Sequence, residues 1–236
     1  MKIIYLHHSG FIVELPKNTI IFDAITNIQP QFLRKGRKSY FLATHVHKDH
    51  FAQRIFSYGT DYNSEYILSD DIPKRGGNTI HYMAPYQHLE FDDSKCGLVA
   101  IDTFGSTDAG VSYMVKAEGK TIFHAGDLNW WDWNPKERPQ INPAVEEADY
   151  KNELDKILKQ YPAGSIDAAF VPVDSRLGSS ACKAAEYFIQ VMQPKVLIPM
   201  HFWDEYSIIR NLENKVFGQG TQICEITKRN EIIYED

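Results

Sequence analysis

The chain has 236 residues, of which 43% are hydrophobic and 24% are charged, a balance that is ordinary for a globular protein with a sizeable core. Its formal net charge is −6. Nonspecific binding to nucleic acid or to an anionic membrane is therefore not expected, because it needs a surplus of Lys and Arg.

The first half of the chain is predicted to consist mainly of strands. In the first forty positions, short runs rich in β-branched and aromatic residues alternate with turn residues, which is typical of an antiparallel meander. The segment 49–57 is compatible with a helix, and Glu118-Gly119 predicts a hairpin turn. The predicted strands are 3–6, 11–15, 19–23, 39–44, 66–68, 79–83, 98–103, 111–116 and 120–124.

The second half alternates helices with strands. Proline at the start, early acids and apolar residues at helical spacing predict a helix over 143–161. A helix over 179–192 is expected to begin at serine caps and to stop at Pro194. We expect an α+β fold with two sheets packed face to face and helices outside, in a single domain over 1–236. The other predicted elements are a helix over 204–216 and strands over 168–173, 196–200, 221–227 and 231–234.

A cluster of metal-ligand residues follows the predicted strand 39–44: His45, His47, Asp49 and His50. Alternate residues of an extended segment point the same way, so His45 and His47 converge, while Asp49 and His50 turn with the chain. Imidazole and carboxylate groups are suitable ligands for zinc, iron or manganese. A solvated loop with chance histidines is the alternative, but four such residues in six positions after a buried strand favour a metal site.

The cluster matches the HxHxDH motif of the metallo-β-lactamase superfamily, and three further segments match in order. They are an early strand that ends in Asp23, the segment FHAGD that ends in Asp127, and a late strand followed by His201. The opening YLHHSGF also resembles the branch of ascorbate-6-phosphate lactonase and related small hydrolases. The matches cover nearly the whole chain. The resemblance implies a four-layer αββα sandwich.

The resemblance also implies a centre that holds one or two divalent transition metals, zinc first, with manganese or iron as alternatives. One ion would be bound by His45 and His47, and Asp127 would bridge it to the other. The residues themselves agree for Asp127, since Gly126 before it allows the sharp turn that aims the carboxylate inward. The implied ligands of the second ion are Asp49, His50 and His201.

One part of the family pattern is missing. The family supplies a third histidine to the first ion from a loop after a mid-sequence strand, and here that loop, 102–110, contains no histidine. Asp108 is a candidate substitute, and Ser106 with Thr107 could hold a water or an anionic substrate group; the alternative is a plain tight turn. In that case the first metal site is completed by water, binds its ion more weakly, or is empty. Two nearby histidines, expected at the surface in an earlier hairpin, are His81 and His88.

Further residues are candidates to support the centre. A liganding imidazole needs its second nitrogen oriented, usually by a carboxylate or a carbonyl, and Asp23 at its strand end suits that role. His8 and His124 lie near the metals or, alternatively, are core histidines whose polar atoms are satisfied. Three tryptophans after Asp127 either wall a substrate pocket or form an apolar patch over a loop or a subunit contact. They are Trp130, Trp131 and Trp133.

These features predict metal-assisted hydrolysis of a small substrate. A metal-held water would attack an ester, lactone, amide or phosphodiester, and Asp49 would orient that water or accept its proton. The alternative is a non-enzymatic metal- or ligand-binding module with the same fold. A diiron flavoprotein role is disfavoured because His47 stands where those proteins usually have Glu, and a tRNA-processing role because the chain is acidic.

The cysteines and the N-terminal segment bear on where the protein works. Cys96, Cys182 and Cys224 are odd in number and scattered, so neither a disulfide framework nor a thiolate zinc site is expected. The first fifteen residues are too interrupted for a signal peptide, and no run approaches the roughly 18 apolar residues of a membrane helix. A cytoplasmic protein without a membrane partner is therefore expected, with its oligomeric state left open.

Overall fold

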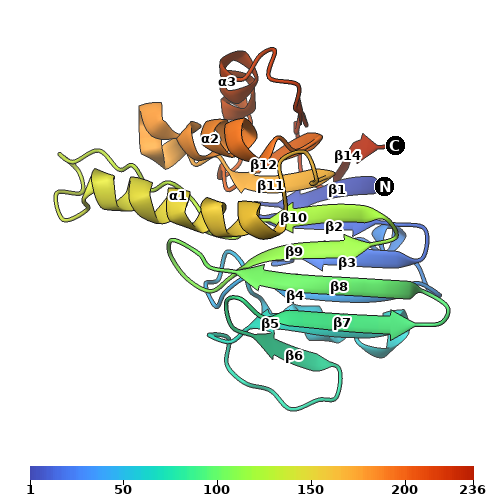
Figure 1. Cartoon of the computed structure of the whole chain (residues 1–236). Coiled ribbons are helices and arrows are strands. Elements are labelled where there is room, and N and C mark those ends of the chain that lie inside the picture. Colours follow the sequence, from blue (N-terminus) through green and yellow to red (C-terminus); the bar gives the residue numbers. More distant parts are fainter.

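The first of two seven-stranded sheets is built mainly from the N-terminal half of the chain (Figure 1). The computed structural model describes residues 1–236, apart from the side chain of Thr60. The predicted meander is present, and the sheet has the order β14-β1-β2-β3-β4-β5-β6, antiparallel from β14 to β3 and parallel from β3 to β6. Its strands are β1 Lys2–His7, β2 Gly10–Glu14, β3 Asn18–Phe22, β4 Lys38–Ala43, β5 Ser64–Ser69, β6 Ile80–Met83 and β14 Glu231–Glu235.

The second sheet has the order β13-β12-β11-β10-β9-β8-β7 and is also mixed. Its hairpins run antiparallel from β7 to β10, and β10 to β13 are parallel. The predicted turn at Glu118-Gly119 joins β9 to β10, and both residues have a positive φ. The strands are β7 His88–Asp93, β8 Gly97–Phe104, β9 Ser112–Ala117, β10 Lys120–His124, β11 Ala168–Pro172, β12 Val196–Met200 and β13 Gln222–Ile223.

The hairpin expected around His81 and His88 is wrong. His81 lies on β6 and His88 on β7, which are edge strands of different sheets. β6 pairs in parallel with β5, and β7 pairs with β8, so the intervening turn carries the chain from one sheet to the other. A turn between two strands does not by itself require that the strands pair.

Three α-helices lie beside the second sheet, next to the strands β10 to β12 (Figure 1). The first begins as predicted, with Asn142 accepting a hydrogen bond from the N–H of Ala144. The predicted start of the second at the serines is wrong, because a 3₁₀ helix kinked at Gly178 precedes it. Among the described helices none is long and apolar enough to cross a membrane. The helices are α1 Pro143–Gln160, α2 Lys183–Met192 and α3 Ser207–Lys215.

The segment 49–57, which is compatible with a helix by sequence, does not form an α-helix. The chain first turns back on itself, with the N–H groups of His50 and Phe51 both bonded to the carbonyl of His47. A 3₁₀ helix, Gln53–Tyr58, follows, and Ile55 is its buried residue. With a single buried position this 3₁₀ helix lacks the apolar face that stabilises a helix of several turns.

Two hydrophobic clusters hold the layers together. Alternate residues of a strand point to opposite faces, and on β1 Tyr5 enters the cluster between the sheets while Ile4 enters the cluster on the outer face. The inner cluster includes residues of both sheets and of α1 and α2. The outer cluster lies under loops and 3₁₀ turns that carry Ile28 and Ile55. Two mixed sheets packed face to face are therefore present as predicted.

Candidate metal centre

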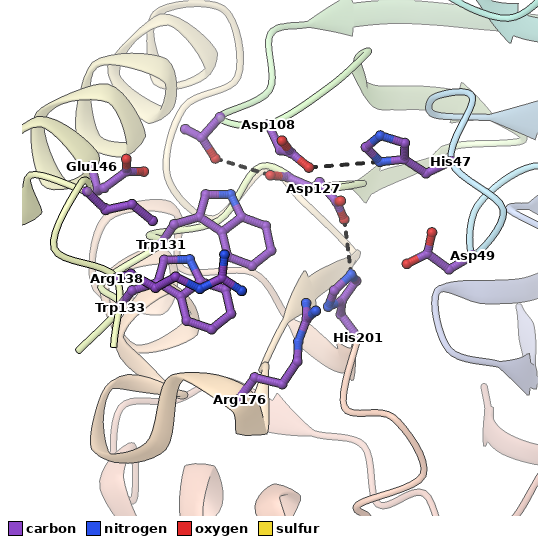
Figure 2. A pocket seen from close by; sticks show the side chains of 12 residues that line it. His47, Asp49, Asp108, Asp127, Trp131, Trp133, Arg138, Glu146, Arg176 and His201 are labelled. Atoms are coloured by element: carbon purple, nitrogen blue, oxygen red, sulfur yellow. Dashed lines mark hydrogen bonds and ion pairs between the residues drawn. The ribbon is translucent and has the colours of Figure 1, made fainter. Parts of the chain in front are cut away.

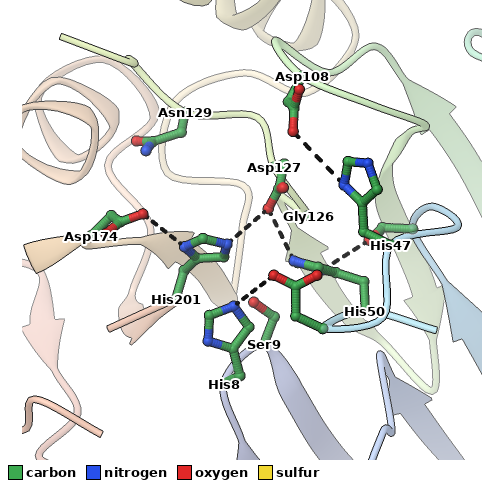
Figure 3. A network of polar contacts seen from close by, with 12 residues as sticks. His8, Ser9, His47, His50, Asp108, Gly126, Asp127, Asn129, Asp174 and His201 are labelled. Carbon is green, nitrogen blue, oxygen red and sulfur yellow. Dashed lines mark hydrogen bonds and ion pairs between the residues drawn. The ribbon is translucent and has the colours of Figure 1, made fainter. Parts of the chain in front are cut away.

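Loops that follow buried strands of both sheets meet at one place and carry most of the predicted site residues (Figure 3). From the first sheet, His8 follows β1, Asp23 follows β3 and the cluster 45–50 follows β4. From the second sheet, Asp127 follows β10 and His201 follows β12. All of these residues except parts of the 45–50 cluster are buried. The sandwich edge thus brings together side chains that are almost two hundred positions apart.

Asp127 lies at the middle of this arrangement. Its Oδ1 is 3.1 Å from His50 Nε2 and 3.3 Å from His201 Nε2, and its Oδ2 is 3.4 Å from His45 Nε2. Nevertheless Asp127 Oδ1, His45 Nε2 and His50 Nε2 are buried and have no aligned hydrogen-bond partner among the described atoms. Buried polar atoms are normally paired, so atoms that are close without being aligned indicate a shared partner between them. A metal ion fits that position.

The donor atoms form three overlapping groups, and within each group they lie within 4.8 Å of one another. Overlap of this kind suits one or two neighbouring ions that share ligands. Asp108 joins His47 here, with 3.9 Å between His47 Nδ1 and Asp108 Oδ2. The loop without a histidine therefore brings a carboxylate beside His47. The groups are His45, His50 and Asp127; His8, Asp49, His50 and His201; and His47, Asp108 and Asp127.

Two buried carboxylates orient the imidazoles from behind. Asp23 Oδ2 is 2.7 Å from His50 Nδ1, and Asp174 Oδ2 is 3.1 Å from His201 Nδ1. Burial alone would raise the pKa of Asp23, but the hydrogen bond with His50 lowers it below its usual range. With Nδ1 engaged, each ring presents Nε2 to the centre. Asp174 was not predicted from the sequence, although it lies two residues after the end of the buried strand β11, much as Asp23 follows β3.

His8 lies among the donors of the second group. It is only 1% exposed, its Nε2 is 3.6 Å from Asp49 Oδ2, and its ring centroid is 4.2 Å from that of His201. Neither ring nitrogen has a hydrogen-bond partner in the described part of the chain. Burial, and then the neighbouring His201, lower the pKa of His8, so the imidazole is neutral and its lone pair is available. His8 therefore lies among the candidate ligands.

Two predicted residues are not brought to the cluster. His124 Nε2 is 2.9 Å from the carbonyl of Ser9, and His124 Nδ1 accepts a hydrogen bond from Gly126 N at 3.2 Å. Both ring nitrogens are thus used by backbone groups, as in a core histidine. Ser106 Oγ accepts from the N–H of Asp108 at 3.3 Å and lines a separate cavity.

A cavity of about 380 Å³ opens in front of the candidate ligands (Figure 2). Trp131 and Trp133 line it on the side opposite the 45–50 cluster, together with Arg138 and Arg176. The third tryptophan, Trp130, packs instead against tyrosines of α1 and α2. Two of the three tryptophans therefore wall the cavity, and the third anchors their loop.

The loop after β10 is held in place by its own contacts. Thr107 Oγ1 donates to the carbonyl of Asn129 at 2.6 Å and accepts from the N–H of Asn129 at 2.9 Å. Gly126 has a φ of 56°, and a Cβ there would lie 2.8 Å from Thr44 Cβ. The expected sharp turn before Asp127 is present. Thr107 therefore fixes this turn and also lines the cavity.

Comparison with known proteins identifies the fold. No family model matches the chain. The UPF0173 metal-dependent hydrolase of Nanoarchaeum equitans is 26% identical and covers 98% of this chain and 99% of its own. The metallo-β-lactamase fold protein YhfI from Bacillus subtilis aligns with 99% of both chains, at a TM-score of 0.60 and 13% identity. The chain has the metallo-β-lactamase fold.

This metallo-β-lactamase-fold protein is thus similar in sequence to UPF0173 metal-dependent hydrolases, and the predicted α+β sandwich is confirmed. CmlA, a diiron β-hydroxylase from Streptomyces venezuelae, also aligns with 98% of this chain and 53% of its own, at a TM-score of 0.63 and 10% identity. The narrower resemblance to the ascorbate-6-phosphate lactonase branch, the single domain over 1–236 and the ligand roles stay predictions.

Proposed function

We propose that this chain is a metal-dependent hydrolase that cleaves an ester, lactone, amide or phosphodiester of a small molecule. One observation carries the proposal: buried imidazole and carboxylate atoms without hydrogen-bond partners converge on Asp127 beside an open cavity. The naming of curated homologues as metal-dependent hydrolases supports the reaction class. The net charge of −6 and the three buried free cysteines support a cytoplasmic enzyme that does not act on nucleic acid.

The donor set fits one or two divalent transition metals, with zinc as the first choice and manganese or iron as alternatives. When bound, such ions lower the pKa of water and stabilise a developing oxyanion. Asp127 is the proposed bridge between the two positions. For the first ion we propose His45, His47 and Asp108, and for the second Asp49, His50 and His201, with His8 beside them.

Side chains of the protein supply the other functions that hydrolysis needs. Asp49 is partly exposed and lines the cavity, so its carboxylate can orient a water molecule and accept its proton. Asp23 and Asp174 keep the imidazoles behind it in one orientation. Trp131, which is 7% exposed, closes part of the cavity to bulk water. Asp49 is therefore the proposed catalytic residue.

Initial rates on a panel of lactones, phosphodiesters, thioesters and amides test this proposal. We expect hydrolysis of at least one class, and Asp49→Asn should lower kcat by about 10²-fold or more, the usual scale of a positioned acid–base group. Asp155→Asn, an exposed carboxylate on α1, is the matched control and should be silent. Inactivity of the metal-loaded protein across the panel would instead favour a non-enzymatic metal- or ligand-binding module.

A further inference from the structure

Two arginines line the cavity on the side opposite the 45–50 cluster. Arg138 and Arg176 line the same cavity as Asp49, Asp127 and His201. Figure 2 shows both side chains reaching into it, Arg138 from the side of the tryptophans and Arg176 from below His201. Arg138 lies in the loop before α1, and Arg176 lies in the 3₁₀ helix Ser175–Ser180 that follows β11. The fold therefore brings both to one cavity, which no local sequence pattern reveals.

Arg176 is held in a fixed orientation. Its Nε lies 2.9 Å from both carboxylate oxygens of Asp174, and its Nη2 also bonds to that side chain. Asp174 is fully buried and contacts His201 as well, so one carboxylate links the arginine to a proposed metal ligand. No described contact uses Arg176 Nη1. This edge of the guanidinium remains available to a bound group.

Arg138 has no hydrogen bond or ion pair from its side chain among the described residues. Its guanidinium carbon lies 4.8 Å from the ring centroid of Trp133, and that of Arg176 lies 5.6 Å from the same centroid. Each guanidinium therefore lies within reach of a cation–π contact with the same indole, and both line one cavity. An anion bound in that cavity would face both cations.

The charges lining the cavity lead to the same conclusion. Asp49, Asp108, Asp127 and Glu146 contribute four carboxylates, and the two arginines contribute two cations. Without metal the lining is net negative, but two divalent ions would make it net positive. A loaded centre would therefore attract an anionic substrate even though the whole chain is acidic.

We propose that Arg138, Arg176 and Trp133 form a subsite for an oxyanion, a carboxylate or phosphate group, carried by the substrate. The inference deepens the proposed hydrolase function and rests on it for the position of the scissile bond, which would face Asp49. Guanidinium groups bind such oxyanions through paired N–H donors. Trp131, between the subsite and His201, would contact the organic part of the substrate. The substrate class is thus a small organic anion.

Binding of phenyl phosphate, benzoate and phenol to the metal-loaded protein, measured by calorimetry, tests the subsite. We expect phenyl phosphate or benzoate to bind more tightly than phenol. Arg138→Gln should weaken binding of that anion about tenfold or more, the scale of a hydrogen bond to a charged group, and leave phenol unchanged. Arg210→Gln, an exposed arginine on α3 that does not line this cavity, is the matched control. Which anion responds tells a carboxylate subsite from a phosphate subsite.

The subsite and the hydrolase can fail separately. Equal affinity of the wild type for all three probes, or equal binding of the anions by wild type and Arg138→Gln, overturns the subsite even if metal content and hydrolysis are normal. Conversely, the protein could bind the anion through Arg138 and yet hydrolyse no ester or amide. That result would support the subsite and contradict the proposed hydrolase function. Arg176→Lys keeps the charge facing Asp174 and should lose affinity for the anion while retaining metal.

Discussion

Asp127 shows why the candidate centre calls for a cation. Burial alone would raise the pKa of this carboxyl, but the neighbouring histidines, His50 first, hold it well below its usual range. The carboxylate is therefore anionic while it is 4% exposed. A buried charge needs compensation, and the surrounding imidazoles supply it only by taking up protons. A divalent ion would satisfy Asp127 and the rings together.

The replacement of the family's third histidine by Asp108 can be tested directly. Asp108→Ala should weaken binding of the first ion about tenfold or more, because the change removes a donor atom beside His47. Ser106→Ala, in the same loop, should leave metal affinity unchanged because its hydroxyl is engaged in the local turn. Competition with a chelator gives both affinities. Equal affinities for the two variants would remove Asp108 from the ligand set.

The role of Asp174 in orienting His201 can also be tested by substitution. Asp174→Ala should lower metal affinity by about 10- to 100-fold, the usual effect of losing a carboxylate that orients a liganding imidazole. His201→Ala should have a larger effect, and Asp155→Ala on α1 none. The same chelator competition measures all three. An Asp174 variant that binds metal as tightly as the wild type would contradict the orienting role.

The sequence predicts some of these residues and not others, for a physical reason. Asp49 and His50 stand in a dense local cluster, so their chemistry can be read from adjacent positions. Asp174 and Arg138 are isolated in the sequence, and their roles arise only where separate loops meet. A polar residue just after a buried strand is the one local indication, and Asp23 and Asp174 share it.

Among the elements, the loop between β8 and β9 depends on a glycine. Gly110 has a φ of +67°, and a Cβ there would lie 2.0 Å from the carbonyl oxygen of Thr44 and 2.5 Å from His45 Cβ. The backbone of this loop thus packs directly against the residue that begins the ligand cluster. Any side chain at this position would displace His45.

Gly110→Ala should therefore destabilise the protein more than Gly97→Ala. Gly97 also has a positive φ, +83°, but a Cβ there would meet nothing within 4 Å. We expect about 1–2 kcal/mol for the backbone conformation alone at Gly97, and about 1–3 kcal/mol more at Gly110 from the overlap. Urea unfolding measures both. Equal losses would show that the loop moves away without cost.

At the element scale, strands were predicted better than short helices. The runs 3–6, 39–44 and 196–200 lie within β1, β4 and β12 or extend one residue past them, because strands buried on both faces read as continuous apolar runs. The segment 49–57 does not form the α-helix with which its sequence is compatible, because the turn there is stabilised by backbone hydrogen bonds to His47, which composition does not reveal.

For the whole molecule, the packing of the two sheets sets the stability. Phe170 on β11 lies 4.6 Å from Phe11 and 5.7 Å from Phe22, measured between ring centroids, so one side chain joins the second sheet to two strands of the first. Phe170→Ala should cost about 3–5 kcal/mol of unfolding free energy. Phe217→Ala is the control, since its side chain is 92% exposed, and should change stability by less than about 0.5 kcal/mol. A small effect at Phe170 would contradict a shared core.

The pairing of strands within the two sheets could not be predicted from the sequence. The order of strands and helices indicates two sheets with helices outside, but it does not assign each strand to a sheet. β6 and β7 follow one another and belong to different sheets, and β14 returns from the C-terminus to pair with β1. These assignments depend on long-range pairing, which the local pattern of apolar residues does not encode.

The metal content of the purified protein, measured by inductively coupled plasma mass spectrometry, tests the central claim most directly. After reconstitution with zinc, manganese or iron and removal of excess ion, the wild type should retain about one or two equivalents per chain. Asp127→Ala should lose most of this metal, and Asp155→Ala should retain it. A wild type that holds no metal, or an Asp127→Ala variant that holds as much as the wild type, would contradict the claim.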